Sequence, residues 1–294
     1  MDIKPKLMNK KHLTLKSKYV LLVLFFFICY LGYSQERILY KQVDSVRLYL
    51  KIFYPDTIGF NEKNYPTILF FHGGGWKNGS SKQLNPHAKY FSQRGMISIL
   101  VDYRTESKHQ TTPFESLKDA KSAMRFVKKN AIKYKIDTTQ IVAAGASSGG
   151  HLAAATALID DYNENTDDIS IDATPDALVL FNPVIDNGPG GYGYERIGKA
   201  YKSFSPLHNL KSGAPPTVLF LGTNDHLIPV ETVKYYQKVM QNVGSECKIH
   251  LFQGQSHGFF NYRNFTFYSE TILRTDEFLQ SLGFLKDIPI VKIN

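Results

Sequence analysis

The feature that most constrains this chain is a short glycine-flanked segment, Gly145-Ala-Ser-Ser-Gly149, between an apolar run and a helical pattern. Residues 140–145 form a mostly apolar run of strand length, and residues 149–159 are rich in alanine and leucine. A sharp turn from strand to helix exposes its central side chain above the edge of a sheet, with the helix N-terminus beneath it. The chain is therefore expected to run from a buried strand straight into a helix that packs on the same sheet.

The central position of this turn predicts a nucleophile. The turn crowds the residues two before and two after its centre, so both must be small. Ser147 has Gly145 and Gly149 in those positions, whereas Ser148 would have Ala146 and Gly150. We therefore expect Ser147, rather than Ser148, to be the reactive serine.

Apolar runs and helical patterns alternate along the rest of the chain. This alternation predicts an α/β fold, in which a mostly parallel central sheet carries helices on both faces. Strands are expected at residues 47–54, 67–71, 96–101, 140–145, 177–181, 217–221 and 247–252, and helices at 85–93, 114–134, 149–159, 230–242 and 264–282. Residues 184–213 make the one long irregular segment, and a loop of that length in a compact domain is usually functional or mobile.

A base and an acid are expected after the last two strands. His257 follows the final strand after a short turn, and a histidine beside the serine could take its proton. Asp225 ends a tight turn after residues 217–221 and would hold the histidine in the correct tautomer. Asp186, after the preceding strand, is the alternative acid. We favour Asp225 because its turn points to the carboxyl edge of the sheet.

A glycine run follows the strand at residues 67–71, in the segment His72-Gly-Gly-Gly-Trp76. A developing oxyanion needs backbone N–H donors with no side chains in the way, which favours glycine after a strand. We expect the amides of Gly74 and Gly75, together with that of Ser148, to form this donor set. His72 is expected to brace the loop through hydrogen bonds.

The N-terminal residues 1–34 have the pattern of a secretory signal peptide. Six lysines precede residue 19, and residues 19–33 are apolar and uncharged. A spanning helix wants about 20 apolar residues, so an uncleaved membrane anchor is the less favoured alternative. We expect cleavage near Ser34, a catalytic domain at residues 35–294 with no stable membrane span, and a secreted or periplasmic location.

Removal of that segment takes away six lysines and one aspartate, so the formal net charge falls from +9 to +4. A mildly basic chain of this kind gives no reason to expect a nucleic-acid partner. Cys247 is the single cysteine left, which excludes an intramolecular disulfide. His, Cys and Asp do not cluster at metal-ligand spacing, so no metal or cofactor is expected.

Taken together, these motifs resemble those of the α/β-hydrolase serine esterases, particularly the acetyl-xylan-esterase-like and feruloyl-esterase-like carbohydrate esterases. The hormone-sensitive-lipase-like group is a more distant resemblance. The motifs that carry it are His72-Gly-Gly-Gly-Trp76, Asp102-Tyr-Arg104, Gly145-Ala-Ser-Ser-Gly-Gly-His151, Gly222-Thr-Asn-Asp225 and His257-Gly258. The order serine, acid, histidine also matches this family and differs from that of trypsin-like and subtilisin-like proteases. The resemblance implies a Ser-His-Asp carboxylesterase on an α/β-hydrolase fold.

The expected substrate is an ester with a short acyl group, of acetyl type, on a polysaccharide or oligosaccharide. Little or no cap domain is expected, because only about a dozen residues separate the predicted cleavage site from the first expected strand. Lids exclude water and enclose long acyl chains, so an uncapped site favours short acyl groups on bulky alcohols. Trp76, Tyr192 and Tyr194 are candidate platforms for a sugar ring or an aromatic acyl group, with ordinary packing as the alternative.

Three other functions remain open at this point. A prolyl-oligopeptidase-like peptidase shares the order of the three residues but generally carries a propeller, for which this chain has no room. A lipase would need an enclosed acyl tunnel. A binding protein on the same scaffold would have lost its nucleophile, whereas this chain keeps serine, histidine and aspartate at the expected places.

Overall fold

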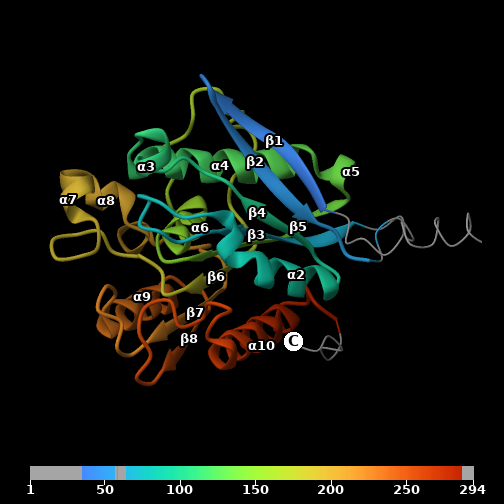
Figure 1. Ribbon diagram of the computed structural model, residues 1–294. Helices are drawn as coiled ribbons and strands as arrows, with labels where there is room; N and C mark the ends of the chain where they lie inside the picture. The colour runs from blue at the N-terminus through green and yellow to red at the C-terminus, as the bar shows by residue number, and fades with distance from the viewer. Residues whose placement is uncertain (1–34, 57, 59–63, 287–294) are drawn as a thin grey trace, which may run out of the picture. The chain divides into compact units, whose positions relative to one another are not determined.

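The computed structural model describes residues 35–56, 58 and 64–286, and the predicted signal peptide at residues 1–34 lies outside them (Figure 1). The described residues form a sheet with the strand order β1-β2-β4-β3-β5-β6-β7-β8. The strands β1, β2 and β4 pair antiparallel, and every pairing from β4 through β3 to β8 is parallel. The strands are β1 (Gln35–Val43), β2 (Val46–Phe53), β3 (Tyr65–Phe71), β4 (Ile97–Val101), β5 (Ile136–Ala146), β6 (Ala177–Phe181), β7 (Thr217–Gly222) and β8 (Cys247–Phe252).

Helices cover both faces of this sheet, so the predicted α/β class with a mostly parallel sheet is confirmed. Side chains of α4, α6 and α9 pack on one face, and side chains of α2 and α10 pack on the other. The α-helices are α2 (Asn85–Gln93), α3 (Glu106–His109), α4 (Pro113–Lys129), α5 (Ala131–Tyr134), α6 (Ser148–Leu158), α7 (Tyr194–Ile197), α8 (Tyr201–Phe204), α9 (Val230–Asn242) and α10 (Phe265–Ser281), and the 3₁₀ helices are η1 (Ser81–Leu84), η2 (Gly198–Ala200) and η3 (Pro206–Asn209). In the part of the chain described, no helix has the length and apolar character needed to cross a membrane.

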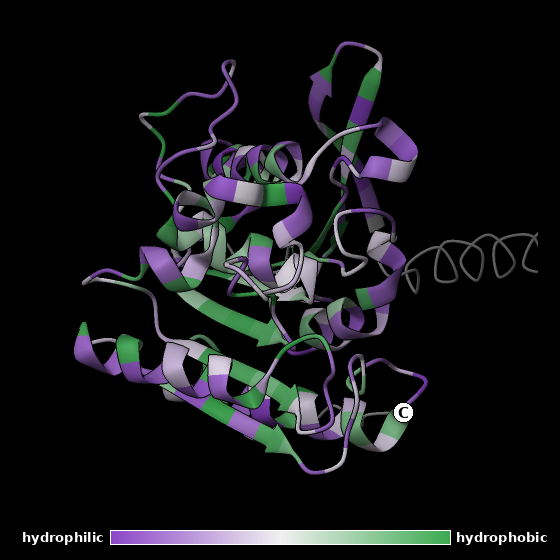
Figure 2. Cartoon of the chain, turned by 90° about the vertical axis from the view of Figure 1, so that its left-hand side faces the viewer, coloured by the Kyte–Doolittle hydropathy of each residue, from purple (hydrophilic) through white to green (hydrophobic). Residues whose placement is uncertain are grey.

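The central strands are buried on both faces, which explains why they appear in the sequence as continuous apolar runs. In β3, Leu69 and Phe71 enter one core, while Ile68 and Phe70 enter the other. Figure 2 shows the same feature as apolar colouring along the inner strands, with polar colouring on the outer surfaces of the helices.

The structure corrects two expected boundaries. The helix expected at residues 114–134 is divided at Asn130, whose backbone (φ −104°, ψ 19°) ends α4 before α5 begins. Its start is fixed by Thr112 and Glu115, which exchange side-chain hydrogen bonds with each other's backbone in a capping box. The segment 184–213 is also less irregular than expected, because it contains α7, η2, α8 and η3.

The strand β1 was not expected, since the sequence prediction placed the first strand at residue 47. It pairs only with β2 at the edge of the sheet, and its polar and apolar residues alternate weakly. An edge strand has one face and one margin open to water, so its sequence lacks the apolar run that marks an inner strand. The strand is anchored by Tyr40, which is buried and donates a hydrogen bond to the Asp102 carbonyl (2.7 Å).

A buried ion-pair network joins β1 to the segment after β4. The Asp119 carboxylate lies 2.7 Å from Lys41 Nζ and 2.8 Å from Arg104 Nη2. Glu164 also reaches both cations, at 3.0 and 2.8 Å. Removing one member would leave a buried charge uncompensated, which is strongly destabilising. The network therefore fixes residues 102–105 against α4.

Three buried histidines make the folding stability depend on pH. Burial lowers the pKa of His87 and of His151 to about 3, and that of His72 to about 4. Both ring nitrogens of His87 are buried without a hydrogen-bond partner among the described residues. In the unfolded chain these histidines have a pKa of about 6.5. Between that pH and the lower pKa of the folded state, each histidine is protonated in the unfolded chain and neutral in the folded chain, so folding must release the proton.

We expect the free energy of unfolding to fall as the pH drops below 6.5, by about 1.4 kcal/mol per pH unit for each such histidine until its folded pKa is reached. His87→Leu should remove one histidine's contribution to this pH dependence. The free energy of unfolding of the variant, taken relative to that of the parent chain, should therefore be about 2 kcal/mol higher at pH 5 than at pH 7.5. Urea unfolding at the two pH values measures this. An equal pH dependence in parent and variant would contradict the assignment.

Candidate active site

Ser147 occupies a strained turn between β5 and α6. Its backbone (φ 54°, ψ −118°) is in a region that residues other than glycine rarely adopt. A Cβ atom on Gly145 would overlap the Gly149 carbonyl, and one on Gly149 would overlap the carbonyl oxygens of Phe71 and His72. Both flanking positions therefore require glycine, a stricter demand than the small residue that the sequence analysis expected.

The two serines of the turn have different environments. Ser148 is fully buried, at 0 % exposure, whereas Ser147 is partly open to solvent. The Ser147 amide donates to the Phe181 carbonyl (2.9 Å), and the Ser147 carbonyl accepts from Val184 (3.1 Å). These bonds tie the turn to the end of β6 and leave the Ser147 side chain directed away from the sheet.

His257 bridges Ser147 and Asp225. Its Nε2 lies 2.9 Å from Ser147 Oγ, and its Nδ1 lies 2.7 Å from Asp225 Oδ2. The Asp225 side chain is buried, and its Oδ1 accepts hydrogen bonds from the amides of Leu227 (2.9 Å) and Ile228 (3.1 Å). With the carboxylate held in this way, the imidazole presents a single orientation to the serine.

Asp186, the alternative acid, does not contact His257 in the described structure. Its Oδ1 accepts from the Gly188 amide (2.8 Å) and lies 3.8 Å from His208 Nδ1. The loop that carries Asp225 is instead bonded to the loop that carries His257. The Thr223 amide donates to the Phe252 carbonyl, and the Asn224 amide donates to the backbone carbonyl of Gln255.

The glycine run lies directly against the elbow. A Cβ atom on Gly73 would lie 3.4 Å from Ser147 Cβ, so the two segments are in contact there. Gly74 (φ 129°) and Gly75 (φ 64°) have backbone conformations that side chains disfavour. Throughout the described ranges, no acceptor is bonded to the amides of Gly74, Gly75 or Ser148. Those three donors are therefore available to a ligand.

His72 and Tyr103 brace the glycine run from behind. His72 Nδ1 donates to the Gly73 carbonyl (2.7 Å), and the Tyr103 hydroxyl donates to the His72 carbonyl (2.7 Å). Their rings stack with centroids 4.2 Å apart. Because burial lowers the pKa of His72 to about 4, this histidine is neutral at physiological pH, in keeping with its expected bracing role.

The prediction that Trp76 forms a substrate platform is wrong. The indole is fully buried and packs against His151, Tyr192 and Phe204, so the alternative of ordinary packing applies. Tyr192 is partly exposed, and its hydroxyl fills the space that a Gly75 side chain would need. Tyr194 is also partly exposed and meets Tyr201 edge to face.

Arg196 is a site residue that the sequence analysis missed. Its Nη1 donates to the Gly75 carbonyl (2.6 Å), and its guanidinium lies 5.3 Å from the Trp76 ring centroid. The helix α7 thereby holds the glycine run, although Arg196 and Gly75 are 121 positions apart in the sequence. No sequence pattern signals this contact, because a single arginine in a four-residue helix has no recognisable spacing.

Asn182 is a second missed residue, at the end of β6. Its side-chain Nδ2 lies 3.0 Å from His257 Nε2 and 3.3 Å from Nδ1, so the amide lies against the imidazole ring. The residue is 1 % exposed and has a positive φ of 36°. Its position immediately after an apolar strand and before Pro183 was a usable signal, since polar residues at strand ends gather at one edge of a parallel sheet.

Within the described residues, no group of three or more His, Cys, Asp or Glu side chains could hold a metal ion. The chemistry that this arrangement can perform is nucleophilic attack by an activated serine beside a set of unbonded amide donors.

Known proteins share this architecture. Residues 50–189 match the BD-FAE family, and residues 183–286 match the dienelactone hydrolase family. Among solved structures, the propionate-bound esterase 2 of Thermogutta terrifontis is 37% identical, with a TM-score of 0.81, over 86% of this chain and 96% of that chain. Its butyrate-bound form is 36% identical, also with a TM-score of 0.81, over 86% of this chain and 96% of that chain. This chain belongs to the α/β-hydrolase serine esterases, a class of carboxylic-ester hydrolases.

Curated relatives match at lower identity, and the first of them is named as an esterase. A probable isoprenylcysteine alpha-carbonyl methylesterase of Arabidopsis thaliana is 26% identical over 65% of this chain and 45% of its own length. Endo-1,4-beta-xylanase B of Butyrivibrio fibrisolvens is 27% identical over 65% of this chain and 32% of its own length. The chain thus spans less than half the length of these relatives.

The packing of Gly149 predicts the cost of a single methyl group. Gly149→Ala should lower the free energy of unfolding by roughly 3 kcal/mol or more, because the backbone carbonyls of Phe71 and His72 cannot yield as a side chain would. Gly244→Ala is the matched control, since Gly244 has open space around it and only its positive φ is strained, at about 1–2 kcal/mol. Urea unfolding would contradict the steric argument if the two variants lost equal stability.

Proposed function

We propose that this protein is a secreted serine carboxylesterase that removes short acyl groups from acylated carbohydrate. The observation that carries the proposed catalytic roles is the contact of His257 with both Ser147 Oγ (2.9 Å) and Asp225 Oδ2 (2.7 Å). Secretion rests on the sequence pattern of residues 1–34 alone.

In the first half of the reaction, Ser147 Oγ attacks the ester carbonyl while its proton passes to His257 Nε2. Asp225 stabilises the resulting imidazolium and keeps Nδ1 as the donor. The tetrahedral oxyanion collapses when His257 gives that proton to the departing alcohol, which leaves the acyl group on Ser147.

In the second half, His257 takes a proton from water, and the resulting hydroxide attacks the acyl carbon. The carboxylic acid leaves as Ser147 Oγ recovers the proton from His257. In both halves the unbonded amides of Gly74, Gly75 and Ser148 are the proposed donors to the oxyanion, and losing one such donor typically costs about 10²–10³ in rate. Arg196 and Tyr103 are proposed to keep these donors in place.

Two comparisons support the substrate class. The structure neighbour has been solved with propionate and with butyrate, which are short-chain carboxylates. A xylanase is among the curated relatives, which supports a carbohydrate as the alcohol. Tyr192 and Tyr194 remain the proposed substrate contacts, because both rings are partly exposed on the segment beside the glycine run.

One prediction of this proposal concerns the length of the acyl group. The chain should hydrolyse p-nitrophenyl acetate and butyrate faster than the octanoate, and Ser147→Ala should lower turnover by about 10⁶. Ser148→Ala is the matched control, because its hydroxyl is buried whereas its backbone amide is retained. Turnover with each ester measures both effects.

Each alternative function predicts a different outcome in the same panel. An octanoate preference would indicate a lipase, and cleavage of prolyl peptides in place of esters would indicate a peptidase. Failure of paraoxon to inactivate the parent chain, with the fold intact, would favour a binding protein. The neighbouring esterase is phosphorylated by paraoxon, so the reagent is a suitable probe.

Another prediction of this proposal distinguishes the two candidate acids, Asp225 and Asp186. Asp225→Asn should lower kcat by about 10⁴, because the amide no longer selects the correct imidazole tautomer. Asp186→Asn should leave kcat within about threefold, since Asp186 bonds the Gly188 amide and makes no contact with His257. A larger loss in Asp186→Asn than in Asp225→Asn would reverse the assignment.

A further inference from the structure

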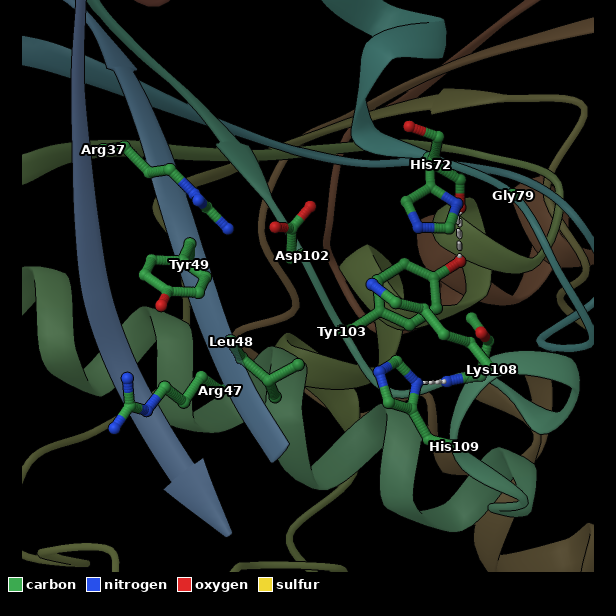
Figure 3. A pocket seen from close by; sticks show the side chains of 12 residues that line it. Arg37, Arg47, Leu48, Tyr49, His72, Gly79, Asp102, Tyr103, Lys108 and His109 are labelled. Carbon is green, nitrogen blue, oxygen red and sulfur yellow. Dashed lines mark hydrogen bonds between the residues drawn. The ribbon is translucent and has the colours of Figure 1, made fainter. Parts of the chain in front are cut away.

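A polar pocket lies beside the start of the glycine run, at His72. Its volume is about 90 Å³, and its lining is mostly polar. Figure 3 shows its walls: the strands β1 and β2 carry Arg37, Arg47 and Tyr49, and the facing wall carries His72, Tyr103 and Lys108. Neither Ser147 nor His257 lines it.

The pocket concentrates positive charge on a chain that is only mildly basic. Arg37, Arg47 and Lys108 are exposed, and no carboxylate of the described residues lies within ion-pair distance of them. Asp102 is the one carboxylate in the lining, and its Oδ1 already accepts a hydrogen bond from Ser81 (2.8 Å). Three cations and one carboxylate line the pocket, so its net charge is positive and favours an anion.

Two of the lining groups are held in place by the protein itself. The guanidinium of Arg37 lies 3.6 Å from the centroid of the Tyr49 ring, which fixes its plane. His72 lines the pocket although only 3 % of it is exposed, and its Nδ1 is committed to the Gly73 carbonyl. Nε2 of the neutral ring is therefore an acceptor without a partner in the described structure, and it suits a hydroxyl group.

The pocket is close to the proposed reaction centre. His72 lines it, and the next residue, Gly73, lies against Ser147, where a Cβ would come 3.4 Å from Ser147 Cβ. Consecutive Cα atoms are about 3.8 Å apart, so one residue of backbone separates the pocket from the elbow. The pocket is therefore adjacent to the segment that carries the proposed oxyanion donors.

We propose that this pocket binds an anionic substituent, a carboxylate or a sulfate, of a sugar unit in the substrate. The inference deepens the proposed function, on which it rests, by naming an acidic carbohydrate as the alcohol. Arg37 and Lys108 pair with the anion, Arg47 adds positive charge at the edge of the pocket, and His72 Nε2 accepts from a neighbouring hydroxyl. The pocket is small, at about 90 Å³, so it holds the charged substituent while the ring lies outside.

The test is binding, so it does not depend on ester hydrolysis. Sodium glucuronate, galactose 6-sulfate and glucose are titrated by calorimetry into the full chain carrying Ser147→Ala. The pocket variant is Arg37→Gln with Lys108→Gln, and the matched control is Lys234→Gln with Lys238→Gln, which removes two exposed charges from α9. Thermal unfolding checks that both double variants are folded.

At least one charged sugar should bind, and glucose should not. The charged sugar that binds identifies whether the pocket prefers a carboxylate or a sulfate. The pocket variant should raise its Kd about tenfold or more, whereas the control should change it less than twofold. No binding of either charged sugar, equal binding of glucose, or equal loss in both double variants would overturn the inference. If instead the parent chain bound an acidic sugar but hydrolysed no ester, the proposed function would fail and the pocket would stand.

Discussion

The contact between the elbow and the glycine run is the constraint on which the rest of the site depends. Gly149 packs so closely on the carbonyls of Phe71 and His72 that no side chain fits between the start of α6 and the end of β3. This close approach brings Gly73 against Ser147 and leaves the amides after it unbonded. The strain at Ser147 persists because β5, β6 and α6 hold the turn from all sides.

The other interactions preserve that contact from a distance. His72 and Tyr103 support the glycine run from behind, and the buried network of Lys41, Arg104, Asp119 and Glu164 holds the segment that carries Tyr103. From the opposite side, Arg196 binds the Gly75 carbonyl. The run is therefore held by residues that lie far apart in the sequence.

Inner strands and reactive groups could be predicted because each has a local signal. The inner strands β3 to β7 are buried along most of their length, so each contains an apolar run, and the motif ending in Asp225 follows such a run directly. Strand β1 was missed because an edge strand can alternate weakly and remain stable through its partner. Trp76 was misjudged because a large aromatic in a loop has the same sequence signature whether it faces solvent or the core.

The sequence by itself determined the class of fold, the apolar runs of the inner strands, and the positions of the elbow serine, the glycine run and the final histidine, with two candidates left for the acid. These follow from hydrophobic periodicity and from steric demands that act within a few residues. Only the tertiary structure decided that Asp225 rather than Asp186 meets His257, that Asn182 and Arg196 join the site, and that three cations line one pocket. Those contacts join residues far apart in the chain, and their distances depend on how the strands and loops pack, which no local pattern encodes.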